Sequence, residues 1–211
     1  MCYVIYTGVG REQQVKKLID RTVPRELYTR CFYPYRHMRK KIAGSWADIY
    51  EWLIPGYLFV ITDRVAEFSV ALGSISRGGR YVRLLGGGKS GARAAVNAGS
   101  EATGVNADTA FSPVDPAEEA WLRRMLGDRW FDIAPGAGDP EDGDNAVADL
   151  SAIDFDENDR VRILSGPLMN FSGNVRRIDL HRRMAEVEVP FMGTLQCLRL
   201  GVEILVRDGD E

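Results

Sequence analysis

The chain has 211 residues, a formal net charge of −3 and a hydrophobic fraction of 45%, which is the composition of ordinary globular protein. It contains no run of 18 apolar residues, so we expect no membrane span, no signal peptide and a cytoplasmic location. Cys2, Cys31 and Cys197 are far apart and form no C-x-x-C pair. We therefore expect reduced thiols and no metal site.

Charge is distributed unevenly along the chain. Residues 11–41 contain ten Lys or Arg against three Asp or Glu, whereas residues 131–159 contain ten Asp or Glu and no Lys or Arg. Such an asymmetry points to a basic working surface and an acidic spacer.

The N-terminal half predicts an α+β fold, a small sandwich of strands and helices. Apolar residues at helical spacing predict a helix over 11–21, which Pro24 ends, and a second short helix after Asp63. The expected strands share short runs rich in β-branched and aromatic residues, and they are 2–6, 31–42, 46–53, 55–61 and 80–85. The second and third of these should form a hairpin.

The rest of the chain divides into an insertion, a helix, a linker and a barrel. Residues 86–110 are rich in Gly, Ala and Ser and predict a mobile loop. Asp115 and Pro116 predict a helix start, and Gly127 its end. The acidic residues 131–153 predict a flexible linker. The last segment predicts a small five-stranded β-barrel with strands at 160–164, 174–179, 184–189, 194–200 and 202–206.

Enzymatic sites are not predicted. Gly88-Lys89-Ser90 lacks the earlier glycine of a phosphate-binding loop, because Arg83 stands there, and no helical pattern follows. His37 and His181 have no triad or metal-ligand spacing. We therefore expect no catalysis and no cofactor.

Two groups of basic residues are candidates for binding nucleic acid. Arg36, Arg39, Lys40 and Lys41 form a basic hairpin arm among aromatic residues, which suits sequence-independent phosphate contacts. Arg176, Arg177, Arg182 and Arg183 belong to an arginine-rich barrel, which suits RNA. Adjacent Arg176 and Arg177 serve one surface only if a bulge lies between them. The alternative for both groups is solvated surface charge.

Two segments carry a resemblance to a known family. Residues 55–60, Pro-Gly-Tyr-Leu-Phe-Val, resemble the central strand of the NGN domain, and residues 159–178 resemble the KOW motif. Both occur in this order in the NusG family of transcription elongation factors. The resemblance implies an NGN-type sandwich over 1–130, a linker over 131–153 and a KOW β-barrel over 154–211.

The family's known contacts imply a set of binding residues. NGN domains grip the clamp helices of bacterial RNA polymerase through an apolar depression, and the matching residues here are Tyr6, Pro55, Tyr57, Phe59 and Leu84. The family's hairpin approaches upstream DNA, which implies residues 36–46. KOW domains of some members bind a nascent RNA hairpin or a protein partner. We expect a monomer, with Tyr57 and Phe59 on a partly exposed patch and the two domains moving independently.

The sequence departs from the general NusG factor at two places. Leu168 stands where that factor carries an aromatic residue, and Arg199 replaces a glutamate. These differences resemble specialised paralogues of the LoaP or RfaH type, which are operon-specific antiterminators that suppress pausing and termination. The general NusG factor and a KOW-bearing, ribosome-associated RNA-binding protein are the alternatives.

Overall fold

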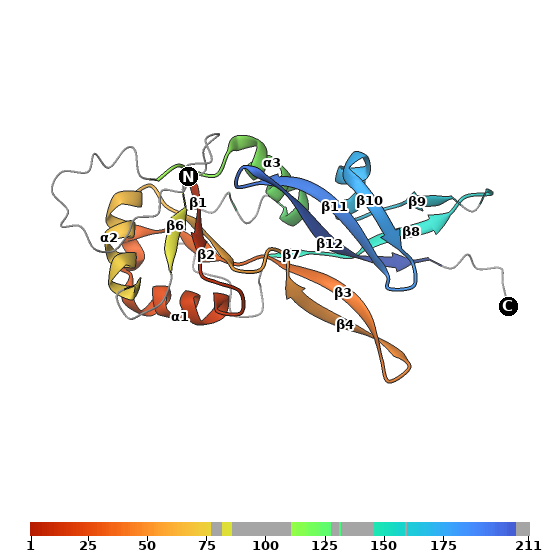
Figure 1. Ribbon diagram of the computed structural model, residues 1–211, viewed down its shortest axis with the longest axis horizontal. Coiled ribbons are helices and arrows are strands. Elements are labelled where there is room, and N and C mark those ends of the chain that lie inside the picture. The colour runs from red at the N-terminus through yellow and green to blue at the C-terminus, as the bar shows by residue number, and fades with distance from the viewer. Residues whose placement is uncertain (77–81, 86–110, 128–130, 132–145, 159, 206–211) are drawn as a thin grey trace.

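The computed structural model describes residues 1–76, 82–85, 111–127, 131, 146–158 and 160–205 (Figure 1). The expected insertion at 86–110 and most of the expected linker lie outside these residues. None of the described helices is long and apolar enough to cross a membrane.

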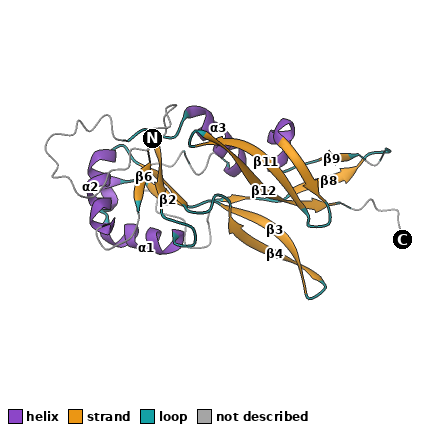
Figure 2. Ribbon diagram, viewed as in Figure 1, coloured by secondary structure: helices purple, strands orange, loops and turns teal. Residues whose placement is uncertain are grey.

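The N-terminal part is a four-stranded antiparallel sheet with helices on one face (Figure 2). Its strands, in spatial order, are β2 (Arg30–Phe32), β5 (Tyr57–Ile61), β1 (Cys2–Tyr6) and β6 (Arg83–Leu85). Its helices are α1 (Glu12–Thr22), the 3-10 turn η1 (Arg25–Leu27) and α2 (Val65–Ser76). Strand alternation places Leu58 and Val60 under the helices. The mixed α/β architecture predicted for this part is confirmed.

A hairpin leaves this sheet and projects from the body of the molecule (Figure 1). It consists of β3 (Tyr35–Ile42) and β4 (Ser45–Trp52), joined through Ala43 and Gly44, which both have positive φ. The single strand predicted over 31–42 is therefore wrong. It divides into β2 and β3 at Pro34, which has no N–H to donate to a ladder.

The C-terminal part is a five-stranded sheet in the order β10-β11-β12-β8-β9. The strands are β8 (Ser151–Phe155), β9 (Val161–Ile163), β10 (Val175–Asp179), β11 (Met184–Phe191) and β12 (Thr194–Ile204), with the 3-10 segment η4 (Pro167–Asn174) between β9 and β10. Two predictions need correction. Residues 194–204 form one strand, and the fifth strand is β8, in the expected linker. The two-residue strand β7 (Val147–Ala148) also falls in that linker and pairs with β3.

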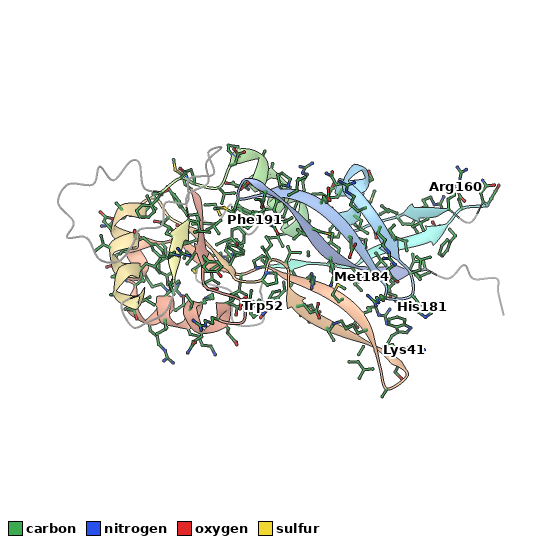
Figure 3. All side chains as sticks on the ribbon, viewed as in Figure 1. Lys41, Trp52, Arg160, His181, Met184 and Phe191 are labelled. Carbon is green, nitrogen blue, oxygen red and sulfur yellow. The ribbon has the colours of Figure 1, made fainter. Side chains whose placement is uncertain are left out.

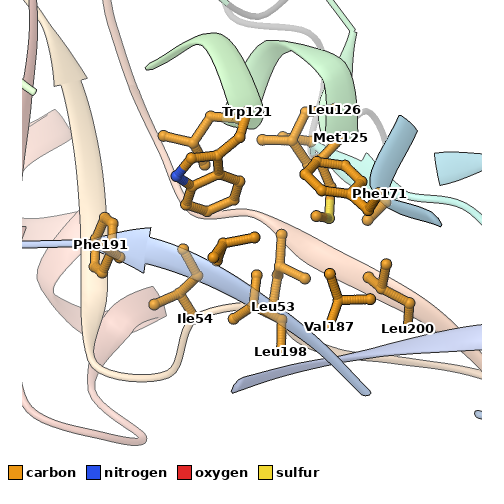
Figure 4. Close-up of a cluster of buried hydrophobic side chains, with 14 of the residues drawn as sticks. Leu53, Ile54, Trp121, Met125, Leu126, Phe171, Val187, Phe191, Leu198 and Leu200 are labelled. Atoms are coloured by element: carbon orange, nitrogen blue, oxygen red, sulfur yellow. The ribbon is translucent and has the colours of Figure 1, made fainter. Parts of the chain in front are cut away.

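Helix α3 (Pro116–Leu126) joins the two sheets into one core. Its predicted cap is confirmed, because the Asp115 side chain accepts a hydrogen bond from the N–H of Ala117 at 2.9 Å. Figure 4 shows its buried side chains above those of the C-terminal sheet and of the β4–β5 connection, namely Trp121, Met125 and Leu126 above Leu53, Ile54, Val187, Leu198 and Leu200. The same cluster continues to Phe59 of the N-terminal sheet. A shared apolar core does not fit the expectation of two independently moving domains.

Strands β3 and β12 approach so closely that only glycine fits between them. A Cβ at Gly201 would lie 2.3 Å from the carbonyl oxygen of His37 and 2.5 Å from Cδ2 of Leu150. Arg36 and Arg39 reach across the same contact to the Arg199 carbonyl and the Glu203 carboxylate. The hairpin is thereby held against the C-terminal sheet.

We predict that Gly201→Ala lowers the free energy of unfolding by about 1–3 kcal/mol, because the new methyl group forces the two backbones apart. Gly73→Ala is the matched control. No atom lies within 4 Å of a Cβ at Gly73, which is inside α2, so this change should stabilise the chain by about 0.5–1 kcal/mol. Urea unfolding of both variants measures the difference. Equal stability of Gly201→Ala and the original chain would contradict the close approach.

Candidate functional site

The face of the N-terminal sheet opposite the helices is the first candidate site. Tyr57 is half-buried there, with its ring 5.5 Å from that of Tyr6 and 5.4 Å from that of Phe191. Phe59 is fully buried, and its ring lies 6.0 Å from that of Phe191. Phe191 ends β11 of the C-terminal sheet (Figure 3). The expected exposed patch is therefore correct for Tyr57 and wrong for Phe59, which Phe191 covers.

Cross-strand register corrects one member of the predicted site. Tyr6 pairs with Tyr57 on one side and with Arg83 on the other, so these three residues share a face. Leu84 pairs with Ile5 and packs beneath the helices, on the opposite face. Leu85 packs instead on the side of Tyr57. Arg83 and Leu85 were not among the predicted residues, because the face of each β6 residue depends on its pairing with β1.

A buried carboxylate holds the loop that carries Pro55. Glu12 is fully buried and accepts a hydrogen bond from the N–H of Gly56 at 2.6 Å. The N–H of Thr7 donates to the carbonyl of Gly56 at 2.8 Å, and Gly56 has a φ of 91° that favours glycine. These contacts hold Pro55 exposed beside the aromatic face.

The turn that presents Phe191 is anchored by α3. The indole N–H of Trp121 donates to the carbonyl of Pro190 at 2.7 Å. The Glu118 carboxylate lies beside the backbone of Met192 and Gly193, which favours its charged form. Glu118 is buried, and this burial raises its pKa above the ordinary value of 4.5.

The predicted basic arm is largely neutralised by carboxylates. Glu51 pairs with Arg36 at 2.9 Å and with Lys40 at 2.5 Å, and the hydrogen bond from Lys40 is the main reason that the pKa of Glu51 is lowered. Arg39 pairs with Glu203 at 2.6 Å. Among the described residues, no carboxylate lies within 4.0 Å of the exposed Lys41. Of the four predicted residues, Lys41 alone has no carboxylate partner among the described residues.

Two of the four candidate arginines in the C-terminal sheet are also paired with carboxylates. Arg176 pairs with Glu188 at 2.5 Å and Arg177 with Asp179 at 3.5 Å. The register of β10 shifts between Val175 and Arg177, and this irregularity lets both arginines be exposed. Arg182 is exposed, and the guanidinium of Arg183 lies 4.3 Å from the ring centroid of Trp46. The last contact joins the two groups that the sequence placed on separate domains.

His37 stands between the hairpin and the segment that enters β8. Its Nδ1 lies 2.8 Å from an oxygen of Asp149, its Nε2 lies 3.2 Å from one of Asp48, and its ring stacks on Tyr50. The hydrogen bond with His37 lowers the pKa of Asp149. In the described part of the chain, no group of three or more His, Cys, Asp or Glu side chains could hold a metal ion. His37 thus links the hairpin to the segment that enters β8.

The aromatic face lies within a segment that matches a known family. Residues 2–97 match the family described as NusG, transcription termination factor nusG. This N-terminal segment is similar to NusG. The match contains Tyr6, Pro55, Tyr57 and Phe59, together with the basic hairpin, and confirms the expected resemblance for this part of the chain.

The chain also matches solved structures. A solved structure described as "Domain interaction in Thermotoga maritima NusG" is 20% identical, with a TM-score of 0.39, and the alignment covers 95% of this chain and 92% of that one. No curated protein matches the sequence.

We predict that Glu118 makes stability fall as pH rises above about 4.5. Its pKa is raised in the folded chain, so the stability linked to its proton is fully present below the unfolded value and is lost as pH rises through the folded pKa. Glu118→Gln retains an oxygen that can accept from the Met192–Gly193 turn and should flatten this dependence. Glu119→Gln, on the same helix, should leave it unchanged. Unfolding free energies measured across pH 4 to 8 that overlay for the original chain and Glu118→Gln would contradict the assignment.

Proposed function

We propose that this chain is a transcription elongation and antitermination factor, without enzymatic activity, that binds bacterial RNA polymerase through the aromatic face of β1 and β5. The observation that carries the proposal is the NusG match over residues 2–97, which includes the residues of this face. The KOW assignment of the C-terminal sheet, with RNA or a protein as its partner, belongs to the same proposal.

The chemistry of the face supports a protein partner. Tyr6 and Tyr57 are half-buried and in edge-to-face contact, and Pro55 beside them is exposed. Tyrosines in such positions contribute much of the binding energy of protein interfaces, because they bury a large ring at a small cost in conformational entropy. Arg83 lies over the Tyr6 ring at 5.8 Å and adds a positive charge at the edge.

Phe191 must leave before a partner can reach Phe59. Its ring contacts Tyr57 and Phe59 in the position that the partner would take. The apparent affinity for polymerase is therefore reduced by the fraction of molecules in which this contact is open. Polymerase binding and displacement of the β11–β12 turn are therefore thermodynamically coupled.

The specialised type of factor is supported by Leu168. Its side chain is fully buried in the core, and its N–H donates to the hydroxyl of Ser151 at 3.0 Å. A buried leucine cannot offer the aromatic surface contact attributed to the general NusG factor at this position.

We predict that Tyr6→Ala weakens binding to purified core RNA polymerase at least tenfold, about 1.4 kcal/mol. Tyr6 suits this test because its ring contacts are with Tyr57 and Arg83 and not with Phe191. Tyr50→Ala is the matched control, since Tyr50 is exposed on the hairpin. Biolayer interferometry gives the affinities. Equal affinity of Tyr6→Ala and Tyr50→Ala would remove this face from the binding site.

The opposite change is predicted for Phe191→Ala. Loss of the ring weakens the internal contact and opens the face, so polymerase should bind more tightly than it binds the original chain. Thermal unfolding must first show that the variant is folded at the assay temperature. Weaker binding by a folded Phe191→Ala variant would argue against competition at this face.

A further inference from the structure

We propose that the tip of the β3–β4 hairpin and the turn between β10 and β11 form one binding site for single-stranded nucleic acid. The site is complete only while the C-terminal sheet packs against the hairpin. It is separate from the aromatic polymerase-binding face and does not depend on that function.

The two segments meet at Trp46. The guanidinium of Arg183 lies 4.3 Å from the Trp46 ring centroid. Lys41 is the cross-strand partner of Trp46, so both side chains stand on the same face of the hairpin. Arg182 precedes Arg183 in the turn, and His181 is exposed beside it. Figure 3 labels Lys41 and His181 at this end of the molecule.

The distribution of ion pairs selects this place over the rest of the basic surface. Five of the eight candidate cations have a carboxylate partner, and they are Arg36, Arg39, Lys40, Arg176 and Arg177. Within the described residues, the other three, Lys41, Arg182 and Arg183, have no carboxylate within 4.0 Å. Lys41 and Arg183 lie beside Trp46, and Arg182 precedes Arg183 in the turn. The nearest acid of the turn, Asp179, accepts from the Arg182 backbone N–H at 3.0 Å and pairs with Arg177.

Trp46 favours a single strand over a duplex. The ring is half-buried, and the guanidinium of Arg183 lies over it. An unpaired base can stack on such a ring while neighbouring phosphates reach lysine and arginine, whereas bases inside a duplex are already stacked. Ile42 at the tip is 56% exposed and adds apolar surface next to the cations. The arrangement has no carboxylate-paired cation and recognises backbone and base faces without sequence readout.

The backbone fixes Arg183 in place. Arg183 has a φ of 50°, a left-handed conformation that few residues other than glycine adopt. Its N–H donates to the carbonyl of Leu180 at 3.3 Å, and its carbonyl accepts from the N–H of Val202 at 3.0 Å. Val202 follows Gly201, which touches the hairpin. The guanidinium is therefore aimed at Trp46 only while β12 lies against β3.

This dependence has a thermodynamic consequence. A ligand of the packed form stabilises the packed form, whereas polymerase in the proposed function binds after Phe191 has been displaced. Each ligand therefore weakens the affinity for the other by the same factor. Single-stranded nucleic acid at this site favours the closed chain.

The test uses the full chain and fluorescein-labelled RNA and DNA strands of about 12 nucleotides with the same sequence. Anisotropy is measured over a KCl series, without polymerase, so failure here leaves the proposed binding of polymerase untouched. We expect Lys41→Gln and Arg182→Gln each to weaken binding and to make the log–log salt slope shallower by about 0.7. The matched controls, Lys40→Gln and Arg176→Gln, should stay within about twofold of the original chain. The RNA and DNA arms identify which strand is the ligand.

Three results of the anisotropy measurements would overturn the proposal. They are no binding at low salt, an equal loss in the controls, and tighter binding of a duplex than of the single strand. Stoichiometry separates one composite site from two independent ones, since the proposal requires one strand per chain and two strands per chain would contradict it. A folded Gly201→Ala variant should bind more weakly although position 201 carries no charge. Unchanged affinity in that variant would contradict the need for packing.

Discussion

The ring of Phe191 makes the contact on which the rest of the structure depends. It lies 5.4 Å from the ring of Tyr57, 6.0 Å from Phe59 and 6.2 Å from Trp121, and so connects the N-terminal sheet, α3 and the C-terminal sheet. Strand alternation turns one face of β5 away from α1 and α2, and exposure of apolar surface costs about 25 cal/mol per Å². The chain covers this face with α3 and its own C-terminal sheet. The polymerase proposed to bind this face must therefore replace an internal contact.

The packing of the C-terminal sheet against the hairpin also determines which charges are paired. The Arg39–Glu203 pair, at 2.6 Å, joins residues 164 positions apart, and Arg183 meets Trp46 across the same joint. Packing of the C-terminal sheet against the hairpin therefore neutralises Arg39 with Glu203. It also brings the guanidinium of Arg183 to Trp46. A surface that appears uniformly basic in the sequence becomes one small cationic site around Trp46, with most other candidate cations paired. In the proposed function, the state of the Phe191 contact thereby decides which ligands the chain can bind.

Local signals were sufficient for much of the fold and for part of the site. Asp115 and Pro116 fix the start of α3, and alternation in β5 separates Tyr57 from Leu58. Leu84 was misassigned because its face depends on pairing with β1. Strand β8 was missed because its buried Ser151 and Asp154 lie in an acidic stretch. Burial of Phe59 by Phe191 arises from complementary faces far apart in sequence, which no local pattern records.

The most direct test of the central claim is amide hydrogen exchange at the β11–β12 turn of the full chain, with and without core RNA polymerase. The N–H groups of Met192 and Gly193 belong to the turn that lies beside the buried Glu118 side chain and that the Trp121 indole anchors through the Pro190 carbonyl, at 2.7 Å. The account predicts that they are protected in the free chain and lose protection when polymerase binds, because Phe191 and its turn must leave the aromatic face. Full protection of both amides in the polymerase-bound chain would contradict it.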